Sequence, residues 1–165
     1  MKITLNPNAK DAATRDGLVA EGGFGKYYTD HMVMCEWSEK DGWGEPHLMP
    51  YGPISLDPAT AVFHYGQEIF EGMKAYRQPD GSIALFRPTA NAKRFANSAK
   101  RLALPEMPVE LFMETIEALV TQDAGWVPSK VGESLYIRPF MIATEVGLGV
   151  RPTNKATYIL IATPA

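Results

Sequence analysis

The sequence contains a single cysteine, Cys35, and only three histidines. One cysteine cannot form an internal disulfide, and these residues are too few for a zinc site with its usual number of sulfur and imidazole ligands. We therefore expect no disulfide framework and no metal site. A reducing, cytoplasmic setting fits this composition.

Charge of one sign and long apolar runs are also scarce. The formal charge is −3 over 165 residues, which indicates no electrostatic surface for DNA or RNA. No stretch approaches the roughly 20 apolar residues that cross a bilayer. The opening MKITLNPNAKDAATRDG lacks the apolar core of a signal peptide. We expect one soluble domain with neither a membrane nor a nucleic-acid partner.

The first part of the chain is polar and ends in a glycine-rich passage, GLVAEGGFGK. A phosphate-binding glycine loop needs a strand before it and a helix after it, and the sequence indicates neither here. We therefore interpret residues 1–25 as a flexible lead-in and residues 26–165 as the folded domain.

Strands and helices follow one another without βαβ alternation. Residues 30–37 are typical of a strand, and GMKAYR and SIALF on either side of QPDG predict a hairpin over residues 72–86. Apolar positions at helical spacing predict a helix over residues 87–104, with Pro88 in its first turn, and a second helix from Pro108. SLYIRPFMIATE and TYILIA predict two further strands. The predicted fold class is α+β, with two principal helices covering one face of a mainly antiparallel sheet.

Two side chains on the predicted strand over SLYIRPFMIATE carry chemistry. Tyr136 and Arg138 are two residues apart, so both point to one face of a strand. A hydroxyl beside a guanidinium fork is suited to gripping a carboxylate. The alternative is an arginine at a strand edge that pairs with a structural Asp or Glu.

Three other candidates have simpler alternatives. Arg94 lies on a polar stripe of the first principal helix, which is usually a solvated face. His64 and Tyr65 offer a titratable ring and a phenol, but a histidine beside a phenylalanine is more often structural. Lys74 would suit a Schiff-base amine only if burial lowered its pKa. The residues taken alone indicate candidates and no reaction.

Several longer strings occur in the order and spacing of a known family. They are FGKYYTDHMVMCEW, GWGEP, FHYGQEIFEGMKAYR, LFRPTANAKRFANSAKRL, SLYIRPFMIATE and GLGVRP. Together they resemble the N-terminal small domain of branched-chain amino acid aminotransferases, which are pyridoxal-phosphate enzymes of fold type IV. The resemblance runs from about residue 20 to the end, and several motifs in register are more specific than any single one.

The resemblance implies roles for particular residues. Arg94 matches the arginine that binds the cofactor phosphate. Tyr136 and Arg138 match the tyrosine and arginine of the substrate pocket, where the arginine of bacterial members receives the side-chain carboxylate of glutamate or 2-oxoglutarate. Phe70 matches a wall of the hydrophobic pocket, and Phe24 matches an aromatic at its entrance.

Two further matches imply a homodimer. Tyr65 and Val150 correspond to residues that, in the family, reach the active site of the neighbouring subunit. The implied reaction moves the amino group of leucine, isoleucine or valine to 2-oxoglutarate, with pyridoxal 5'-phosphate as the electron sink. The implied partners are thus small amino acids and 2-oxo acids.

The sequence departs from the family pattern in one serious respect. The lysine that forms the Schiff base with the cofactor belongs to a second domain of the family, and Lys74 matches no catalytic position. We therefore expect no catalytic residue here and little or no aminotransferase activity from this chain alone, as a truncated, proteolytic or split product. The alternatives are a folded dimerisation module, D-amino acid transamination or aminodeoxychorismate cleavage, although YIRPF and GLGVRP are of the branched-chain type.

Overall fold

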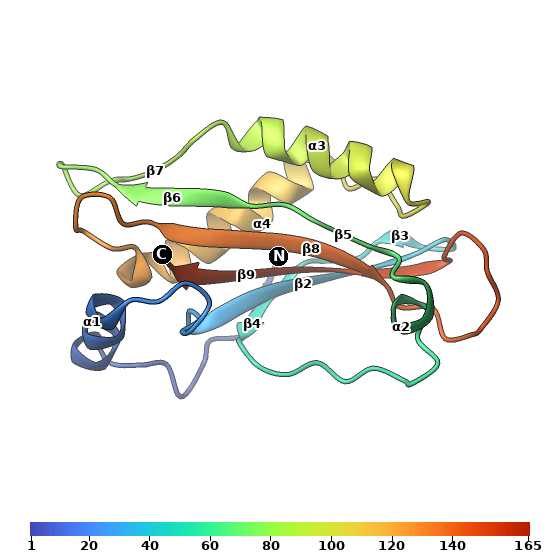
Figure 1. The fold of residues 1–165 in the computed structure, drawn as a ribbon, viewed down its shortest axis with the longest axis horizontal. Coiled ribbons are helices and arrows are strands. Elements are labelled where there is room, and N and C mark those ends of the chain that lie inside the picture. Colours follow the sequence, from blue (N-terminus) through green and yellow to red (C-terminus); the bar gives the residue numbers. More distant parts are fainter.

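A single sheet of nine strands organises the computed structural model, which describes all residues 1–165 (Figure 1). Helices α3 and α4 pack together against one face of this sheet. The elements in chain order are β1 (Lys2–Ile3), α1 (Ala12–Glu21), β2 (His31–Ser38), β3 (Gly42–Trp43), β4 (His47–Pro50), α2 (Ala61–Tyr65), β5 (Glu68–Phe70), β6 (Met73–Arg77), β7 (Ile83–Leu85), α3 (Pro88–Arg101), α4 (Val109–Gln122), the 3-10 turn η1 (Ala124–Trp126), β8 (Leu135–Ala143) and β9 (Lys155–Pro164). The predicted α+β class is confirmed.

The sheet has the strand order β1-β4-β2-β9-β8-β6-β7, with β3 paired to β2 and β5 paired to β8. Only the short pair of β1 and β4 is parallel. Strand β9 lies between β2 and β8 and pairs with both along most of its length. The strand nearest the end of the chain is therefore at the centre of the sheet.

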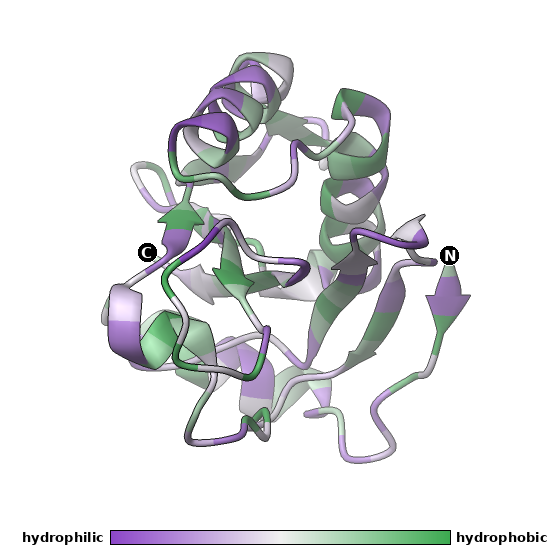
Figure 2. Ribbon diagram, turned by 90° about the vertical axis from the view of Figure 1, so that its right-hand side faces the viewer, coloured by the Kyte–Doolittle hydropathy of each residue, from purple (hydrophilic) through white to green (hydrophobic).

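The two faces of the sheet differ because side chains alternate along each strand. On β8, Leu135, Ile137 and Met141 are fully buried toward the helices, whereas Tyr136 and Arg138 point to the opposite face. We call this opposite side the open face. Figure 2 shows the two long helices gathered on one side of the strands.

Aromatic side chains fill the centre of the core beneath the helices. The rings of Phe95 on α3 and Phe112 on α4 lie 5.4 Å apart, and Tyr158 on β9 is within 5.7 Å and 6.1 Å of them. All three are completely buried. Burying each such ring stabilises the fold by about 2–3 kcal/mol.

The hairpin and both long helices appear where the sequence predicts them. β6 and β7 are joined by the predicted turn, in which Asp80 accepts hydrogen bonds from the Ser82 backbone and hydroxyl, and Gly81 adopts a left-handed conformation with φ 86°. Helix α3 spans Pro88–Arg101, within the predicted range 87–104. Pro88 is in its first turn as predicted, because proline suits a position whose N–H has no helical partner.

Two regular elements lie in the segment expected to be a flexible lead-in, residues 1–25. β1 extends the sheet edge, and α1 is capped by Asp11, whose side chain accepts from the Thr14 N–H at 2.8 Å. The lead-in interpretation missed α1 because its apolar face is weak: none of its residues is buried. A further short helix, α2, lies in a stretch for which the sequence indicated no regular element, and it ends at the left-handed Gly66.

No helix combines the length and apolar character that a bilayer span requires. No group of three or more His, Cys, Asp or Glu side chains is arranged to hold a metal ion.

Candidate functional site

Tyr136 and Arg138 form a hydrogen-bonded pair on the open face of β8. The guanidinium of Arg138 donates to the Tyr136 hydroxyl from Nε at 3.2 Å and from Nη2 at 2.7 Å. The pair exists because residues two apart on a strand share a face. The predicted juxtaposition of a hydroxyl and an N–H fork is thus present, with both groups holding each other in place.

Aromatic rings enclose this pair on two sides. The Arg138 guanidinium stacks over the Phe70 ring at 4.5 Å, and Phe24 meets the Tyr136 ring edge-on at 4.9 Å. Phe70 belongs to β5, which pairs with β8, whereas Phe24 arrives from the loop after α1. Both phenylalanines are more than 60% exposed. The structure therefore brings Phe24, Phe70, Tyr136 and Arg138 together. The two phenylalanine rings remain accessible to a ligand.

Arg138 has no carboxylate partner anywhere in the chain. The alternative of a strand-edge arginine paired with a structural acid is therefore wrong, since β8 is also an interior strand. A half-buried guanidinium keeps its positive charge, so an anionic ligand stabilises it. The remaining N–H groups of Arg138 are available to bind one.

Gly72 determines the position of the Tyr136 hydroxyl, and sequence reasoning missed it. A Cβ at Gly72 would lie 2.3 Å from the Tyr136 hydroxyl oxygen and 3.0 Å from the ring carbon that bears it. Only glycine lets the ring lie over this turn between β5 and β6. The signal in the sequence was the Phe-Glu-Gly turn itself, which does not reveal its tertiary neighbour.

Arg94 and Glu71 form a second polar cluster on this side of the fold. Glu71 is only 4% exposed, and its two oxygens accept from Arg94 Nε at 2.6 Å and Nη2 at 2.8 Å. The side chain of Asn91 adds a third hydrogen bond at 3.0 Å. Burial alone would raise the pKa of Glu71, but these hydrogen bonds hold the pKa below its usual value.

The expectation of a solvated face for Arg94 holds only in part. Its side chain is 68% exposed, yet its guanidinium is fixed by Glu71. Nε and one N–H of Nη2 are occupied, so three of the five N–H groups of the guanidinium remain free. A fixed, exposed cation of this kind is suited to a phosphate.

Tyr65 on α2 and Val150 in the loop between β8 and β9 belong to two segments that meet at one end of the molecule. The Tyr65 hydroxyl donates to the Leu148 carbonyl, which ties α2 to the loop between β8 and β9. Val150 is 83% exposed. This end of the molecule also exposes Phe63, Val146 and Leu148. No hydrogen bond or ring contact links Tyr65 or Val150 to Arg138 within the chain.

The two remaining sequence candidates have modest roles. The His64 ring bonds to the Pro58 carbonyl at 3.0 Å and lies 6.2 Å from the Tyr65 ring, contacts that agree with a structural histidine. Lys74 is exposed and lies opposite Tyr136 on the open face, without an acidic partner. A Schiff-base amine needs an apolar surrounding that disfavours its charge, and the exposed position of Lys74 does not supply one.

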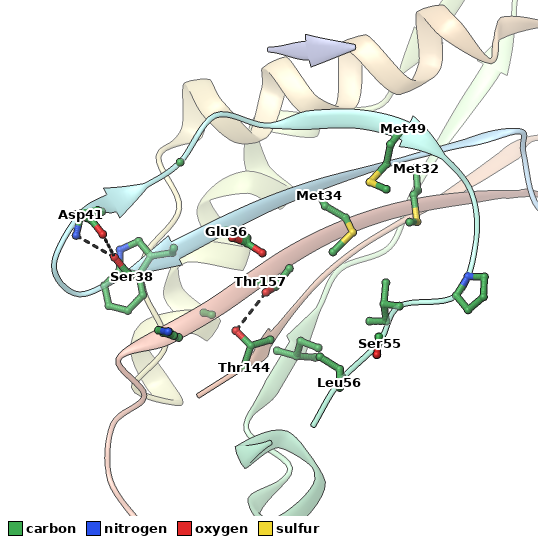
Figure 3. A pocket seen from close by; sticks show the side chains of 18 residues that line it. Met32, Met34, Glu36, Ser38, Asp41, Met49, Ser55, Leu56, Thr144 and Thr157 are labelled. Carbon is green, nitrogen blue, oxygen red and sulfur yellow. Dashed lines mark hydrogen bonds between the residues drawn. The ribbon is translucent and has the colours of Figure 1, made fainter. Parts of the chain in front are cut away.

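A cavity that the sequence did not predict lies on the same open face, farther along the sheet (Figure 3). It has a volume of 720 Å³ between strands β2, β8 and β9 and the segment 53–56. Met32, Met34 and Met49 line one part, and Thr144 and Thr157, hydrogen-bonded at 3.2 Å, lie near another. The residues that line the cavity come from segments distant in sequence, so no local sequence pattern could predict it.

The fold matches solved aminotransferase structures. A branched-chain amino acid aminotransferase from Escherichia coli superposes with a TM-score of 0.60 at 24% identity, over 81% of this chain and 41% of that one. A second enzyme of this name, from T.th. and complexed with N-(5'-phosphopyridoxyl)-L-glutamate, gives a TM-score of 0.57 at 28% identity over 78% of this chain and 39% of that one. The chain thus has the fold of part of a fold type IV aminotransferase.

Proteins related in sequence carry the same enzyme name as these structures. A probable branched-chain-amino-acid aminotransferase from Streptomyces coelicolor is 57% identical over 99% of this chain, and the enzyme from Mycolicibacterium smegmatis is 56% identical over 99%. No family model matches. The chain is therefore similar over nearly its whole length to part of these branched-chain amino acid aminotransferases. It spans less than half the length of these relatives, 46% and 45%.

Proposed function

We propose that this chain forms the N-terminal domain of a branched-chain amino acid aminotransferase that uses pyridoxal 5'-phosphate. The substrates would be leucine, isoleucine or valine with 2-oxoglutarate, giving branched-chain 2-oxo acids and glutamate. The observation that carries the proposal is Arg138: it has no acidic partner and lies between the exposed ring of Phe70 and the hydroxyl of Tyr136.

This arrangement accounts for two kinds of substrate in one site. The rings of Phe24 and Phe70 offer apolar surface to an aliphatic side chain. The Arg138 fork, held by Tyr136, offers N–H groups to a substrate that ends in a carboxylate. Tyr65 and Val150 would complete the site of a second subunit in a homodimer, in keeping with the apolar surface exposed around them.

The cofactor is assigned on the chemistry of Arg94. Its guanidinium is fixed by Glu71 and keeps free N–H groups, so it fits a phosphate dianion. When bound, pyridoxal phosphate supplies an electron sink for reactions at the amino acid α-carbon. We propose that the lysine that binds it lies in the portion of the relatives' length that this chain does not span, so that activity requires that portion.

Substrate binding is tested by titrating the chain with 2-oxoglutarate while its amide and Tyr136 ring signals are followed by NMR. The signals of β8 and Phe70 should shift, and Arg138→Met should reduce the affinity at least ten-fold. Arg101→Met, at the exposed end of α3, is the matched control and should leave the titration unchanged. Equal shifts in wild type and Arg138→Met would contradict the proposed site.

The proposed absence of the cofactor lysine from this chain is tested by mass spectrometry. The chain is incubated with pyridoxal phosphate, reduced with borohydride and mapped. We expect no stoichiometric adduct on a single lysine. A specific adduct, on Lys74 for instance, would show that the chain carries a Schiff-base site of its own and that the proposed division of roles is wrong.

A further inference from the structure

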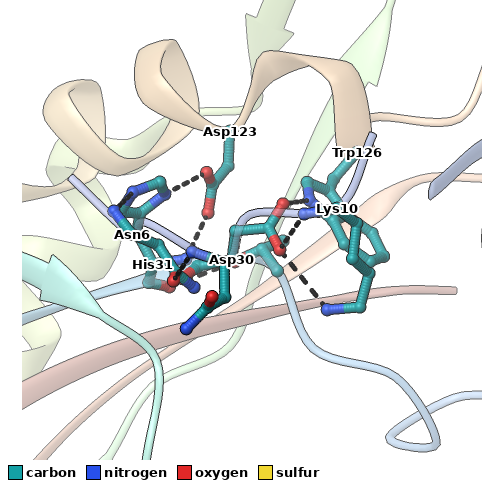
Figure 4. A network of polar contacts seen from close by, with 8 residues as sticks. Asn6, Lys10, Asp30, His31, Asp123 and Trp126 are labelled. Atoms are coloured by element: carbon teal, nitrogen blue, oxygen red, sulfur yellow. Dashed lines mark hydrogen bonds and ion pairs between the residues drawn. The ribbon is translucent and has the colours of Figure 1, made fainter. Parts of the chain in front are cut away.

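A buried polar network fastens the N-terminal segment to the sheet and to α4 (Figure 4). Asp30 and His31, at the start of β2, are 6% and 3% exposed. They contact the segment on one side, through Asn6 and Lys10, and the end of α4 on the other, through Asp123. Segment 1–10 is thus held by side chains that are far from it in sequence.

The hydrogen bonds of His31 define its protonation state. The backbone N–H of Asn6 donates to His31 Nε2 at 2.9 Å. A backbone amide can only donate, so Nε2 must carry a lone pair. The ring proton is therefore on Nδ1, which lies 2.7 Å from the Asp123 carboxylate and donates to it. The ring is neutral in this fold.

The charged groups around His31 come from three elements. Asp123 at the end of α4 binds both the ring and the His31 backbone N–H, the latter at 2.9 Å. Asp30, the preceding residue, accepts from the Lys10 N–H and ammonium and from the Trp126 indole N–H at 2.8 Å. Across the sheet, His31 is paired with Pro50 of β4, which carries no charge.

We propose that His31 is an acid-sensitive latch for the N-terminal segment. A proton on Nε2 would turn the acceptor of the Asn6 N–H into a donor that faces another donor. The protonated ring and the Asn6 contact therefore exclude each other. The imidazolium would remain paired with Asp123, so the ring stays in place while the Asn6 N–H loses its acceptor. Residues 1–6 are then held by the Asn6 side chain on the Asp30 carbonyl at 2.9 Å, by the Met1 ammonium near Glu45 and Glu114, and by backbone bonds to the β4 side. In the proposal the lost bond and the donor–donor clash tip this exposed segment toward opening.

The opening is confined to residues 1–9. Lys10 is bound to Asp30 through its N–H and its ammonium, neither of which depends on the His31 ring, so Lys10 is the hinge. The residues released include β1 and Thr4. The Lys2 amide donates to the carbonyl of Pro46, just before β4, and the Thr4 amide donates to the carbonyl of Leu48 in β4. Release exposes the edge of β4, which is a row of unpaired backbone groups able to accept another strand. The latch thus controls an edge of the sheet and does not depend on the proposed activity.

His47 provides an internal contrast. It also contacts the segment, through the Thr4 hydroxyl at 2.8 Å. A hydroxyl can either donate or accept, so it turns to suit a protonated ring. Titration of His47 therefore leaves its contact intact, whereas titration of His31 does not.

The test is an NMR titration of the intact chain from about pH 8 to pH 5, where histidines change charge. Ring nitrogen shifts should show the Nδ1–H tautomer of His31 at high pH. Hydrogen-exchange protection of the Thr4 and Asn6 amides, corrected for intrinsic rates, should fall at least ten-fold with the midpoint of the His31 ring titration. The Lys10 amide should keep its protection.

Variants assign the effect to one ring. His47→Gln and His64→Gln should leave the transition unchanged, and His31→Gln, whose side-chain oxygen can still accept from Asn6, should abolish it. If His31→Gln does not fold, the wild-type midpoints decide. Constant Thr4 and Asn6 protection, a midpoint that follows His47, or equal loss of protection at Lys10 and in β8 and β9 would overturn the proposal.

Discussion

Arg94 and Glu71 join an exposed guanidinium to a buried carboxylate through two hydrogen bonds, at 2.6 Å and 2.8 Å. The two residues come from α3 and from the turn between β5 and β6. A carboxylate that is buried and hydrogen-bonded needs its partner, whereas an exposed arginine usually does not. The pair therefore fixes the arginine and also anchors α3 to the sheet.

The Arg94 and Glu71 pair should make the free energy of unfolding depend on pH in the acidic range. Hydrogen bonds lower the pKa of Glu71 from its ordinary 4.5 in the folded chain. A lowered folded pKa contributes stability above the unfolded value, and this contribution disappears as the pH falls through the folded pKa. In Glu71→Gln the contribution is absent at every pH. Urea midpoints between about pH 7 and pH 3 should therefore fall more steeply in wild type than in Glu71→Gln. Glu117→Gln, on the exposed face of α4, should follow wild type, and parallel curves for wild type and Glu71→Gln would refute the assignment.

Gly72→Ala is expected to displace Tyr136. The new methyl group would lie 2.3 Å from the tyrosine oxygen, so the ring must move away from Arg138 and Phe24. Overpacking of this kind costs about 1–3 kcal/mol. Urea denaturation should show that loss, and the NMR contact between Phe24 and Tyr136 should disappear. Gly52→Ala, with open space around its Cβ, is the control. An unchanged contact between Phe24 and Tyr136 would show that the backbone of the turn moves and the Tyr136 ring does not.

Tyr158 and Thr115 should behave non-additively. The Thr115 hydroxyl donates to the Phe112 carbonyl at 2.7 Å, so the Tyr158 hydroxyl donates to Thr115 at 2.9 Å. Tyr158→Phe removes a donor cleanly and should cost about 1 kcal/mol, whereas Thr115→Val strands a buried hydroxyl and should cost about 2–3 kcal/mol. The double variant should cost less than the sum of the two, because nothing is left unpaired. Simple additivity in urea unfolding would mean that the hydroxyls act independently.

Cys35 should be inert in the folded chain. Its burial, with smaller effects from Glu114 and Glu36, raises the pKa of the thiol to about 11. The reactive species is the thiolate, so a disulfide reagent at about pH 8 should label Cys35 only when the chain opens. Labelling should be slow in buffer and fast in urea, with small-molecule thiol as the reference. Rapid, stoichiometric labelling in buffer would show that this part of the core is accessible.

The regular elements with strong periodic patterns were predictable from the sequence. Helices α3 and α4 have continuous apolar stripes, and the hairpin of β6 and β7 has a defined turn. Helices α1 and α2 were missed because neither forms a clear apolar stripe: α1 buries none of its residues and α2 buries only Ala61. Tertiary packing decides such short segments.

The residues of the candidate site also fall into those that the sequence predicted and those that it did not. Tyr136 and Arg138 were predicted to share a face because a strand alternates its side chains with period two. Gly72 and Glu71 were missed because their roles depend on neighbours from other elements, as do those of His31 and Asp123, which are 92 residues apart in sequence. A local sequence pattern predicts which side chains share one face of a helix or strand. It does not predict which side chains of other elements pack against that face.

The position of β9 has a consequence for synthesis on the ribosome. Val33 of β2 pairs with Leu160 of β9, and β2 and β8 meet only through that strand. At about 5–20 residues per second, a ribosome takes on the order of ten seconds to proceed from one partner to the other. During that time β2, with its apolar run HMVMC, has emerged and has no central neighbour to pair with. Completion of the sheet therefore waits for residues 155–164, and a nascent chain paused before them is the species that a chaperone would have to protect.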